Sequence, residues 1–131
     1  TGNTGQKIIN LLKDSKDYQP IAMIRKVEQK AQFASQGVET RLGDLENDIS
    51  NVADNVDKII FAAGSGGKKP FEVDQEGAKK LMDAGKRANI SKFVMLSSMG
   101  ADKPEQATDL KEYMQAKRFV GVLKEVNLIH F

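Results

Sequence analysis

The chain has 131 residues, with 20 Lys and Arg against 18 Asp and Glu, and it contains neither cysteine nor tryptophan. This length fits one domain, and the lack of cysteine excludes a disulfide framework, a thiolate metal site and a thiol nucleophile. The interspersed charges and the 6% aromatic content argue against a nucleic-acid partner. The chain has a single histidine, His130, which excludes a metal site built on histidines.

Apolar strand-like runs alternate with helical patterns along the chain. In chain order the sequence predicts a helix after a glycine turn at 1–5, a strand at 21–24, a helix at 27–36, a strand at 38–42, a helix at 49–56, a strand at 58–63, a helix at 73–85, a strand at 92–96, a helix at 110–120 and a strand from 127. Gly37 is the expected C-cap of the second helix. The alternation predicts an α/β fold with a parallel sheet and right-handed crossovers.

The turn Thr1-Gly2-Asn3-Thr4-Gly5 opens the first predicted helix. Its glycines allow the backbone to approach a pyrophosphate, and the helix N-terminus offers free N–H donors and the positive end of the dipole. The next strand ends at Arg25-Lys26, about 20 residues after Gly5, where a dinucleotide-binding fold places its ribose-binding residue. A basic residue there favours a 2′-phosphate, and therefore NADP over NAD. The simpler interpretation is that Arg25 is a solvated residue after a strand.

With these features the chain resembles the atypical short-chain dehydrogenases/reductases. More narrowly, it resembles the NAD(P)-binding, NAD-dependent epimerase/dehydratase proteins related to the NmrA-like group. Gly2 and Gly5 match the last two glycines of the family motif G-x-x-G-x-x-G. The further matches are Gly43-Asp44-Leu45 to the Asp–hydrophobic pair beside the adenine, Ala62-Ala63-Gly64 to the turn on the adenosine side, Phe93 to Ser98 to the strand that leads to the family serine, and Tyr113 to Lys117 to the Y-x-x-x-K motif.

The resemblance implies a catalytic group of Tyr113, Lys117 and Ser98. Tyr113 and Lys117 are four residues apart and share one face of a helix, where the ammonium would lower the tyrosine pKa from about 10. In family terms Tyr113 exchanges a proton with a substrate hydroxyl or carbonyl, Lys117 also holds the nicotinamide ribose, and Ser98 hydrogen-bonds the substrate oxygen. Ser97 is a second candidate for the serine and is expected beside the cofactor.

The fourth catalytic residue of the family is usually an asparagine, and Asp74 occupies the matching position, as in the atypical subgroup. This departure would alter the proton relay. Asp74 could instead be the N-cap of the helix that follows, and Ser97-Ser98 could cap the next segment.

These features predict an NADP-dependent oxidoreductase or epimerase that acts on a small hydroxyl or carbonyl substrate, with NAD as the less favoured cofactor. The alternative is a non-catalytic NAD(P)-binding module for redox sensing or regulation, of the NmrA-like kind. A flavodoxin-like or receiver fold that uses Asp44 would not explain Gly2, Gly5 and Arg25 together. We expect a cytoplasmic location and neither a membrane nor a nucleic-acid partner.

The resemblance also implies a Rossmann-like, doubly wound parallel sheet with helices on both faces. In its strand order 3-2-1-4-5-6, the first strand is central and feeds the glycine turn. That strand is missing from this chain, so the strands at 21–24 and 58–63 are expected to leave unpaired backbone edges at a gap. We therefore expect residues 1–131 to form a partial NAD(P)-binding Rossmann domain, from a protein of roughly 200 residues or more.

Overall fold

A computed structural model describes the chain at residues 2–65, 68–97, 101, 103–106, 115–116 and 126–129. In chain order its elements are α1 (Asn3–Leu12), β1 (Ile21–Ile24), α2 (Gln29–Ala34), β2 (Glu39–Leu42), β3 (Lys58–Phe61), the π-helix η1 (Pro70–Glu76), α3 (Gly77–Arg87), β4 (Lys92–Leu96), the 3-10 turn η2 (Pro104–Gln106) and β5 (Val126–Ile129). The predicted alternation of helix and strand is confirmed over these residues except at 49–56, and most of the helix predicted at 110–120 lies outside the described residues.

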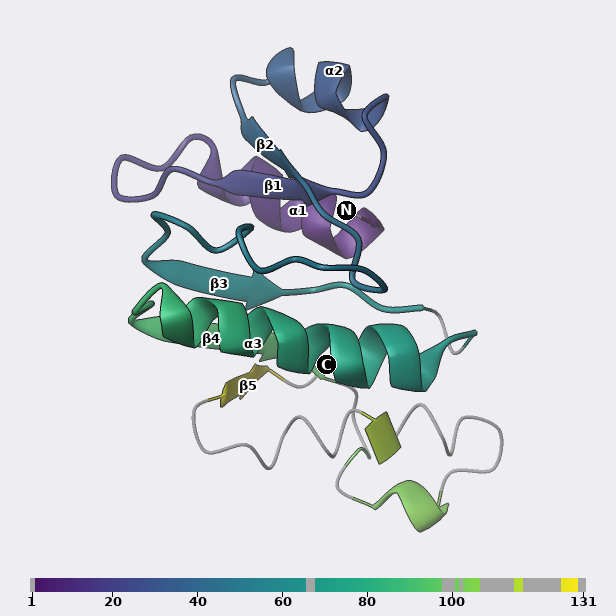
Figure 1. The fold of residues 1–131 in the computed structure, drawn as a ribbon. Helices are drawn as coiled ribbons and strands as arrows, with labels where there is room; N and C mark the ends of the chain where they lie inside the picture. The colour runs from purple at the N-terminus through teal and green to yellow at the C-terminus, as the bar shows by residue number, and fades with distance from the viewer. Residues whose placement is uncertain are drawn as a thin grey trace.

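The strands form a two-stranded sheet, β1-β2, and a three-stranded sheet, β3-β4-β5, and every pairing is parallel. Figure 1 shows the strands in the spatial order β2, β1, β3, β4, β5. Within the described residues, one edge of β1 and one edge of β3 have no strand partner. This order corresponds to 3-2 and 4-5-6 of a doubly wound sheet, with the position of strand 1 between β1 and β3.

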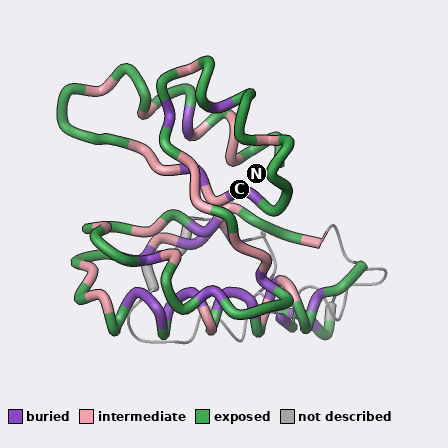
Figure 2. The backbone as a smooth tube through the Cα atoms, turned by 45° about the horizontal axis from the view of Figure 1, so that its top comes forward, coloured by how far each residue is buried: buried purple, intermediate pink, exposed green. Residues whose placement is uncertain are grey.

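Two hydrophobic clusters hold the elements together. The smaller joins α1, β1 and α2, with Phe33 fully buried at its centre. The larger lies between α3 and the three-stranded sheet, and it consists of Leu45, Ile49, Phe61, Ala78, Leu81, Met82, Phe93 and Met95. Figure 2 shows buried and exposed residues alternating along α3, as an amphipathic helix on a sheet requires.

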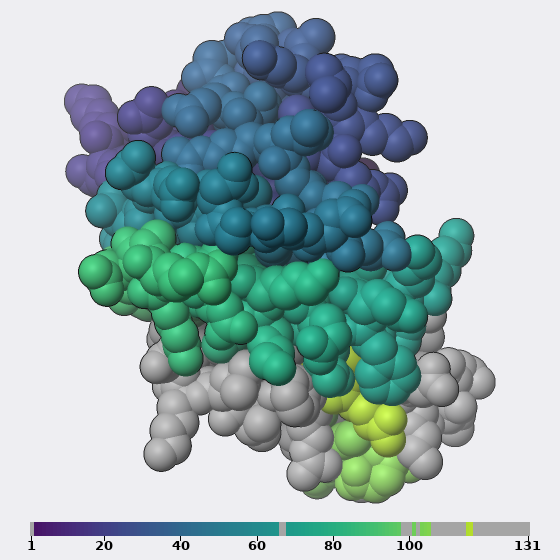
Figure 3. Space-filling view, in the orientation of Figure 1, coloured from purple at the N-terminus to yellow at the C-terminus, as the bar shows by residue number. Residues whose placement is uncertain are grey.

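The segment between β2 and β3 differs from its prediction. Residues 49–56 were expected to be helical, but the chain forms turns there, because Asp48 and Ser50 satisfy each other locally and Asn55 has a positive φ of 54°. The apolar residues of this segment still contribute to the core, since Ile49 and Ala53 are buried. In the space-filling view this segment lies between the N-terminal elements and α3 (Figure 3).

Two other predicted features have clear outcomes. Gly37 adopts a left-handed φ of 70° after α2, and Val38 N–H donates to the Phe33 carbonyl at 3.0 Å, so the predicted C-cap is confirmed. The helix predicted at 73–85 begins inside the π-helix η1 and continues as α3, with Gly77 N–H bonded to the Glu72 carbonyl, five residues back.

Candidate functional site

The predicted cofactor residues follow the carboxyl ends of the strands. Arg25 comes after β1, Asp44 and Leu45 after β2, Ala62 to Gly64 after β3, and Ser97 after β4. Ligands of open parallel sheets bind outside these ends. The fold therefore brings the predicted residues to the end of the strands where such a ligand binds.

The N-terminus of α1 is open. Gly2 is its N-cap, no side chain caps it, and no acidic residue lies in the first turn. A Cβ at Gly2 would meet nothing within 4 Å. Since the first intrahelical bond is Gln6 N–H to the Gly2 carbonyl at 3.0 Å, the N–H groups of Asn3, Thr4 and Gly5 precede the helical ladder. These free donors and the positive helix end form a suitable seat for an anion.

The backbone after β1 is fixed by one side chain. The N–H groups of Arg25 and Lys26 both donate to Gln29 Oε1, each at 3.1 Å. Both basic residues are exposed, and neither side chain has a partner among the described residues. Two exposed cationic side chains therefore lie directly after the carboxyl end of β1.

The turn after β2 is ordered by Asp44. Its Oδ1 accepts from Glu46 N–H at 3.1 Å, its Oδ2 accepts from Asn47 Nδ2 at 3.3 Å, and its carbonyl accepts from Asn47 N–H at 2.9 Å. Leu45, the next residue, is 8% exposed and belongs to the larger core. In the predicted Asp–hydrophobic pair, Asp44 therefore forms the hydrogen bonds of the turn, and Leu45 packs the turn against the larger core.

The loop after β3 is joined to η1 through Asp74. Asp74 is fully buried, and its Oδ2 accepts from Ser65 N–H at 3.0 Å and from Ser65 Oγ at 2.6 Å. A Cβ at Gly64 would lie 3.0 Å from Asp74 Oδ1, so only glycine fits easily against this carboxylate. Asp74 lies inside η1, which begins at Pro70, so the N-cap interpretation is wrong.

Sequence reasoning missed Ser65. It lies nine residues before Asp74, in a glycine-rich segment that reads as a flexible loop, and no helix or strand periodicity relates the two positions. The signal available in the sequence was a serine directly after the Ala62-Ala63-Gly64 turn.

The predicted serine pair is only half described. Ser97 directly follows β4 and is 6% exposed, and its Oγ has no hydrogen-bond partner among the described residues. Ser98, Tyr113 and Lys117 lie outside the described residues. Buried hydroxyls are normally satisfied, so the Ser97 Oγ is a candidate contact for a ligand at the end of β4.

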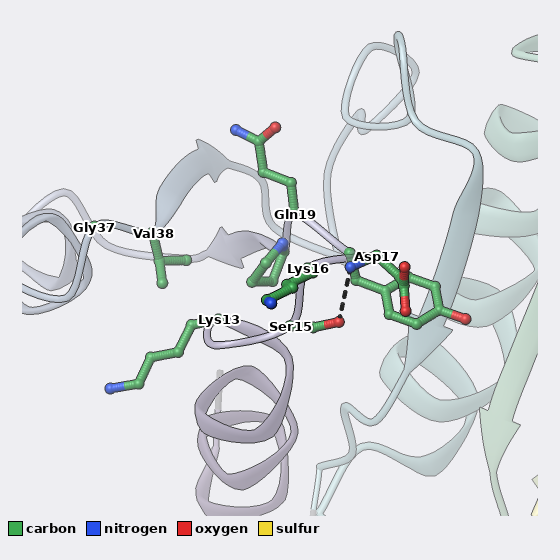
Figure 4. Close-up of a pocket in the computed structure, with 9 residues that line it drawn as sticks. Lys13, Ser15, Lys16, Asp17, Gln19, Gly37 and Val38 are labelled. Carbon is green, nitrogen blue, oxygen red and sulfur yellow. Dashed lines mark hydrogen bonds between the residues drawn. The ribbon is translucent and has the colours of Figure 1, made fainter.

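A pocket of about 400 Å³ lies at the opposite end of the strands, before β1 and β2 (Figure 4). It is lined by Lys13, Ser15, Lys16, Asp17, Tyr18, Gln19, Pro20, Gly37 and Val38. None of the predicted cofactor residues lines this pocket, so we do not assign the cofactor to it.

The described residues lack two further features. They contain no cluster of His, Cys, Asp and Glu side chains that could hold a metal ion. Nor does any of their helices have the length and apolar character needed to cross a membrane.

Similarity to known proteins assigns the chain to a family. The sequence pattern of a family described as NAD(P)H-binding matches residues 1–124. The chain belongs to this NAD(P)H-binding family. The expected resemblance and the Rossmann-like fold are thereby confirmed.

Three similar proteins illustrate how this NAD(P)H-binding chain compares with known proteins. The Bacillus subtilis protein named uncharacterized sugar epimerase YhfK is 37% identical over 134 residues, covering 96% of this chain and 63% of the relative. A protein from Bacillus halodurans, assigned as an NAD-dependent epimerase/dehydratase, superposes with a TM-score of 0.88 at 28% identity, covering 99% and 64%. The oxidoreductase ylbE from Lactococcus lactis gives 0.80 at 34% identity, covering 98% and 62%. The chain thus spans a little under two thirds of each relative.

Proposed function

We propose that the protein is an NADP-dependent oxidoreductase or epimerase of the atypical short-chain dehydrogenase/reductase type, acting on a small hydroxyl or carbonyl substrate. The observation that carries this proposal is the combination of an uncapped helix N-terminus at Gly2 with the exposed basic side chains of Arg25 and Lys26, which have no partner within the part of the chain that the structure describes. The family assignment and the names of the relatives, which include an epimerase and an oxidoreductase, support it.

The residues present fit a dinucleotide phosphate. Gly2, Asn3, Thr4 and Gly5 would hold the pyrophosphate through backbone N–H groups, because no side chain or acid competes at this helix end. Arg25 would pair with the 2′-phosphate, which is absent from NAD. When bound, the nicotinamide supplies or accepts the hydride.

The remaining cofactor contacts are proposed from the ends of β2, β3 and β4. Asp44 and Leu45 would border the adenine, and Ala62, Ala63 and Gly64 would border the adenosine. Ala63 and Gly64 are exposed, which leaves their backbone accessible to a nucleotide. Ser97 would contribute its buried Oγ from the end of β4.

The chemistry is proposed for the residues that match the family motif. Tyr113 would transfer a proton to or from the substrate oxygen, and the Lys117 ammonium would favour its deprotonated form and hold the ribose. Ser98 would donate a hydrogen bond to the same substrate oxygen. Asp74, at the position of the family asparagine, would support this group from η1, where its carboxylate already holds Ser65.

Binding and turnover test this proposal separately. The protein is titrated with NADP⁺ and NAD⁺, and cofactor oxidation is then followed across a panel of carbonyl compounds with Tyr113→Phe as the control. We expect tighter binding of NADP⁺ and turnover that Tyr113→Phe abolishes. Binding without any turnover beyond that of Tyr113→Phe would favour the non-catalytic sensing module, and no binding of either nucleotide would overturn both.

A further inference from the structure

A lysine of α3 holds the turn that follows β2. Lys80 is half-buried, and its Nζ donates to the Leu45 carbonyl at 3.1 Å and to the Asn47 carbonyl at 3.3 Å. A lysine ammonium has three donors and no acceptor, so one group can serve two carbonyls at once. Lys80 therefore connects α3 to both ends of a short stretch of backbone.

The two carbonyls bracket the residues that Asp44 orders from the other side. Asp44 bonds the N–H of Glu46 and both the backbone and the side chain of Asn47. The direction of a carbonyl fixes the plane of its peptide unit. With Lys80 on the carbonyls and Asp44 on the N–H groups, the peptide planes of residues 45–47 are held from both sides.

The close approach of α3 makes this contact possible. A Cβ at Gly77 would lie 2.8 Å from Leu45 Cβ, so the helix backbone packs directly on the turn at that point. Lys80 is three residues later, close to one helical turn, and lies on the same face as Gly77. Its stem can therefore run along the helix to the turn.

A second lysine contacts the same turn in a different way. Lys69 Nζ pairs with Glu46 Oε1 at 2.5 Å, but the Lys69 side chain is 53% exposed. Exposed ion pairs contribute little to position or stability. Lys80 acts on the main chain from a half-buried site, so of the two lysines it is the one that holds the backbone of the turn.

We propose that Lys80 is a positioning residue for the adenine end of the cofactor, acting through the Asp44–Asn47 turn. This inference rests on the proposed function, because the turn carries the Asp44-Leu45 pair assigned to the adenine. Removing the ammonium leaves two carbonyls without their donor and releases one side of the turn. The adenine contacts then loosen while the pyrophosphate seat at α1 keeps its geometry.

The test uses the purified protein and the variants Lys80→Met, Lys80→Arg and Lys79→Met. Methionine keeps most of the apolar stem without the charge, arginine restores a cationic donor, and Lys79 is the exposed neighbour on the same helix. Calorimetric titration gives Kd for NADP⁺, for adenosine 2′,5′-bisphosphate as the adenosine half, and for nicotinamide mononucleotide as the other half. Thermal melts check folding of each variant, and amide hydrogen exchange reports on residues 45–47.

Lys80→Met is expected to weaken NADP⁺ and the adenosine half equally, by roughly three- to tenfold, and to leave nicotinamide mononucleotide unchanged. Exchange at residues 45–47 should rise, Lys80→Arg should recover most of the affinity, and Lys79→Met should behave as the unmodified protein. Full retention of affinity for the adenosine half by a folded Lys80→Met, or equal weakening of both halves, overturns the role of Lys80. Failure of the unmodified protein to bind NADP⁺ or NAD⁺ contradicts the proposed function itself.

Discussion

Asp74 accepts two hydrogen bonds from Ser65 through a single carboxylate oxygen, from the N–H at 3.0 Å and from the hydroxyl at 2.6 Å. The pair ties the loop after β3 to η1 inside the protein, where Asp74 has no exposed surface. Burying a polar group without hydrogen-bond partners is costly, so these two bonds stabilise the buried side chain. The loop that follows the Ala62-Ala63-Gly64 turn is therefore held in place by a side chain of η1, which is not part of the sheet.

Asp74→Ala is expected to lower the free energy of unfolding by about 1–3 kcal/mol, because it strands the Ser65 donors and removes charge-assisted bonds. Ser65→Ala should cost about 1 kcal/mol, and Asp74→Asn less than Asp74→Ala, because an amide oxygen still accepts. Urea denaturation measures all three. The double variant Asp74→Ala with Ser65→Ala should lose less than the sum of the two single losses. Strict additivity would show that the two residues do not act together.

Arg25 should decide between the two cofactors. Arg25→Ala removes the cation proposed to meet the 2′-phosphate, so Kd for NADP⁺ should rise by roughly tenfold while Kd for NAD⁺ changes little. Lys13→Ala is the control, because Lys13 lines the pocket at the opposite end of the strands. Equal weakening of both cofactors by Arg25→Ala would contradict recognition of the 2′-phosphate.

Replacing either of two glycines by alanine should lower the stability of the protein, for different reasons. Gly77→Ala places a Cβ 2.8 Å from Leu45 Cβ, and this crowding should outweigh the better helix propensity of alanine and destabilise by about 1–3 kcal/mol. Gly37→Ala has open space around it but a φ of 70°, so strain alone should cost about 1 kcal/mol. Thermal melts compare the two variants. Only Gly77→Ala should also raise hydrogen exchange in the Asp44–Asn47 turn.

Asp48 gives an expected dependence of stability on pH. Hydrogen bonds from the backbone and then the hydroxyl of Ser50 lower the pKa of Asp48 below its ordinary 3.8, with smaller contributions from Arg87 and Lys80. A lowered pKa means that the contribution to stability is present above 3.8 and is lost as pH falls through the folded value. The difference in unfolding free energy between the unmodified protein and Asp48→Asn should therefore shrink in acid. A difference that stays constant down to the acid limit would contradict this.

The pKa of Lys69 shifts in the opposite direction from that of Asp48. Its hydrogen bond to Glu46, followed by the charge of that carboxylate, raises the pKa of Lys69 above 10.5. This small surface contribution is present below 10.5 and is lost as pH rises through the folded value. The stability of Lys69→Gln and of the unmodified protein should converge at strongly alkaline pH.

One edge of β1 and one edge of β3 have no strand partner among the residues described in the structure, which suggests a test of how the sheet is completed. We propose that residues 1–131 are part of a Rossmann domain and that a further parallel strand fits between these edges. An apolar strand segment placed ahead of Thr1 should raise the melting temperature by roughly 5 °C or more, because it pairs backbone groups on two strands. The same segment with prolines at alternate positions should give no gain. Equal melting temperatures for both would contradict the proposal.

The sequence predicted those parts of the molecule that follow local periodicity. Short apolar runs at 21–24 and 59–63 identified β1 and β3, and spaced small residues identified α3, because burial on a sheet demands these patterns. The prediction was wrong at residues 49–56. Ile49 and Ala53 have helical spacing in the sequence, but the chain forms turns there instead of a helix. There, short polar side chains bond their own backbone more favourably than a helix would.

The candidate site was predictable only where it lies on consecutive residues. The glycine turn, Arg25 and the Asp44-Leu45 pair are local signals at strand or helix ends. The hydrogen bonds of Ser65 to Asp74 depend on how η1 packs against the loop after β3, and those of Lys80 to Leu45 and Asn47 depend on how α3 packs against the turn after β2. Such contacts join residues far apart in sequence, and no periodicity encodes them.

The π-helical winding of η1 makes the length of this segment matter as much as its sequence. Its bond from Gly77 N–H to the Glu72 carbonyl encloses one more residue than an α-helical turn. A deletion between Pro70 and Asp74 that restored α-helical winding would turn one side of the segment by roughly 100° relative to the other. If α3 kept its packing, the residues before the deletion would turn relative to Asp74, and the hydrogen bonds between Ser65 and the Asp74 carboxylate would be lost. Among related chains, single-residue insertions and deletions in this segment should therefore be far rarer than substitutions at its exposed positions.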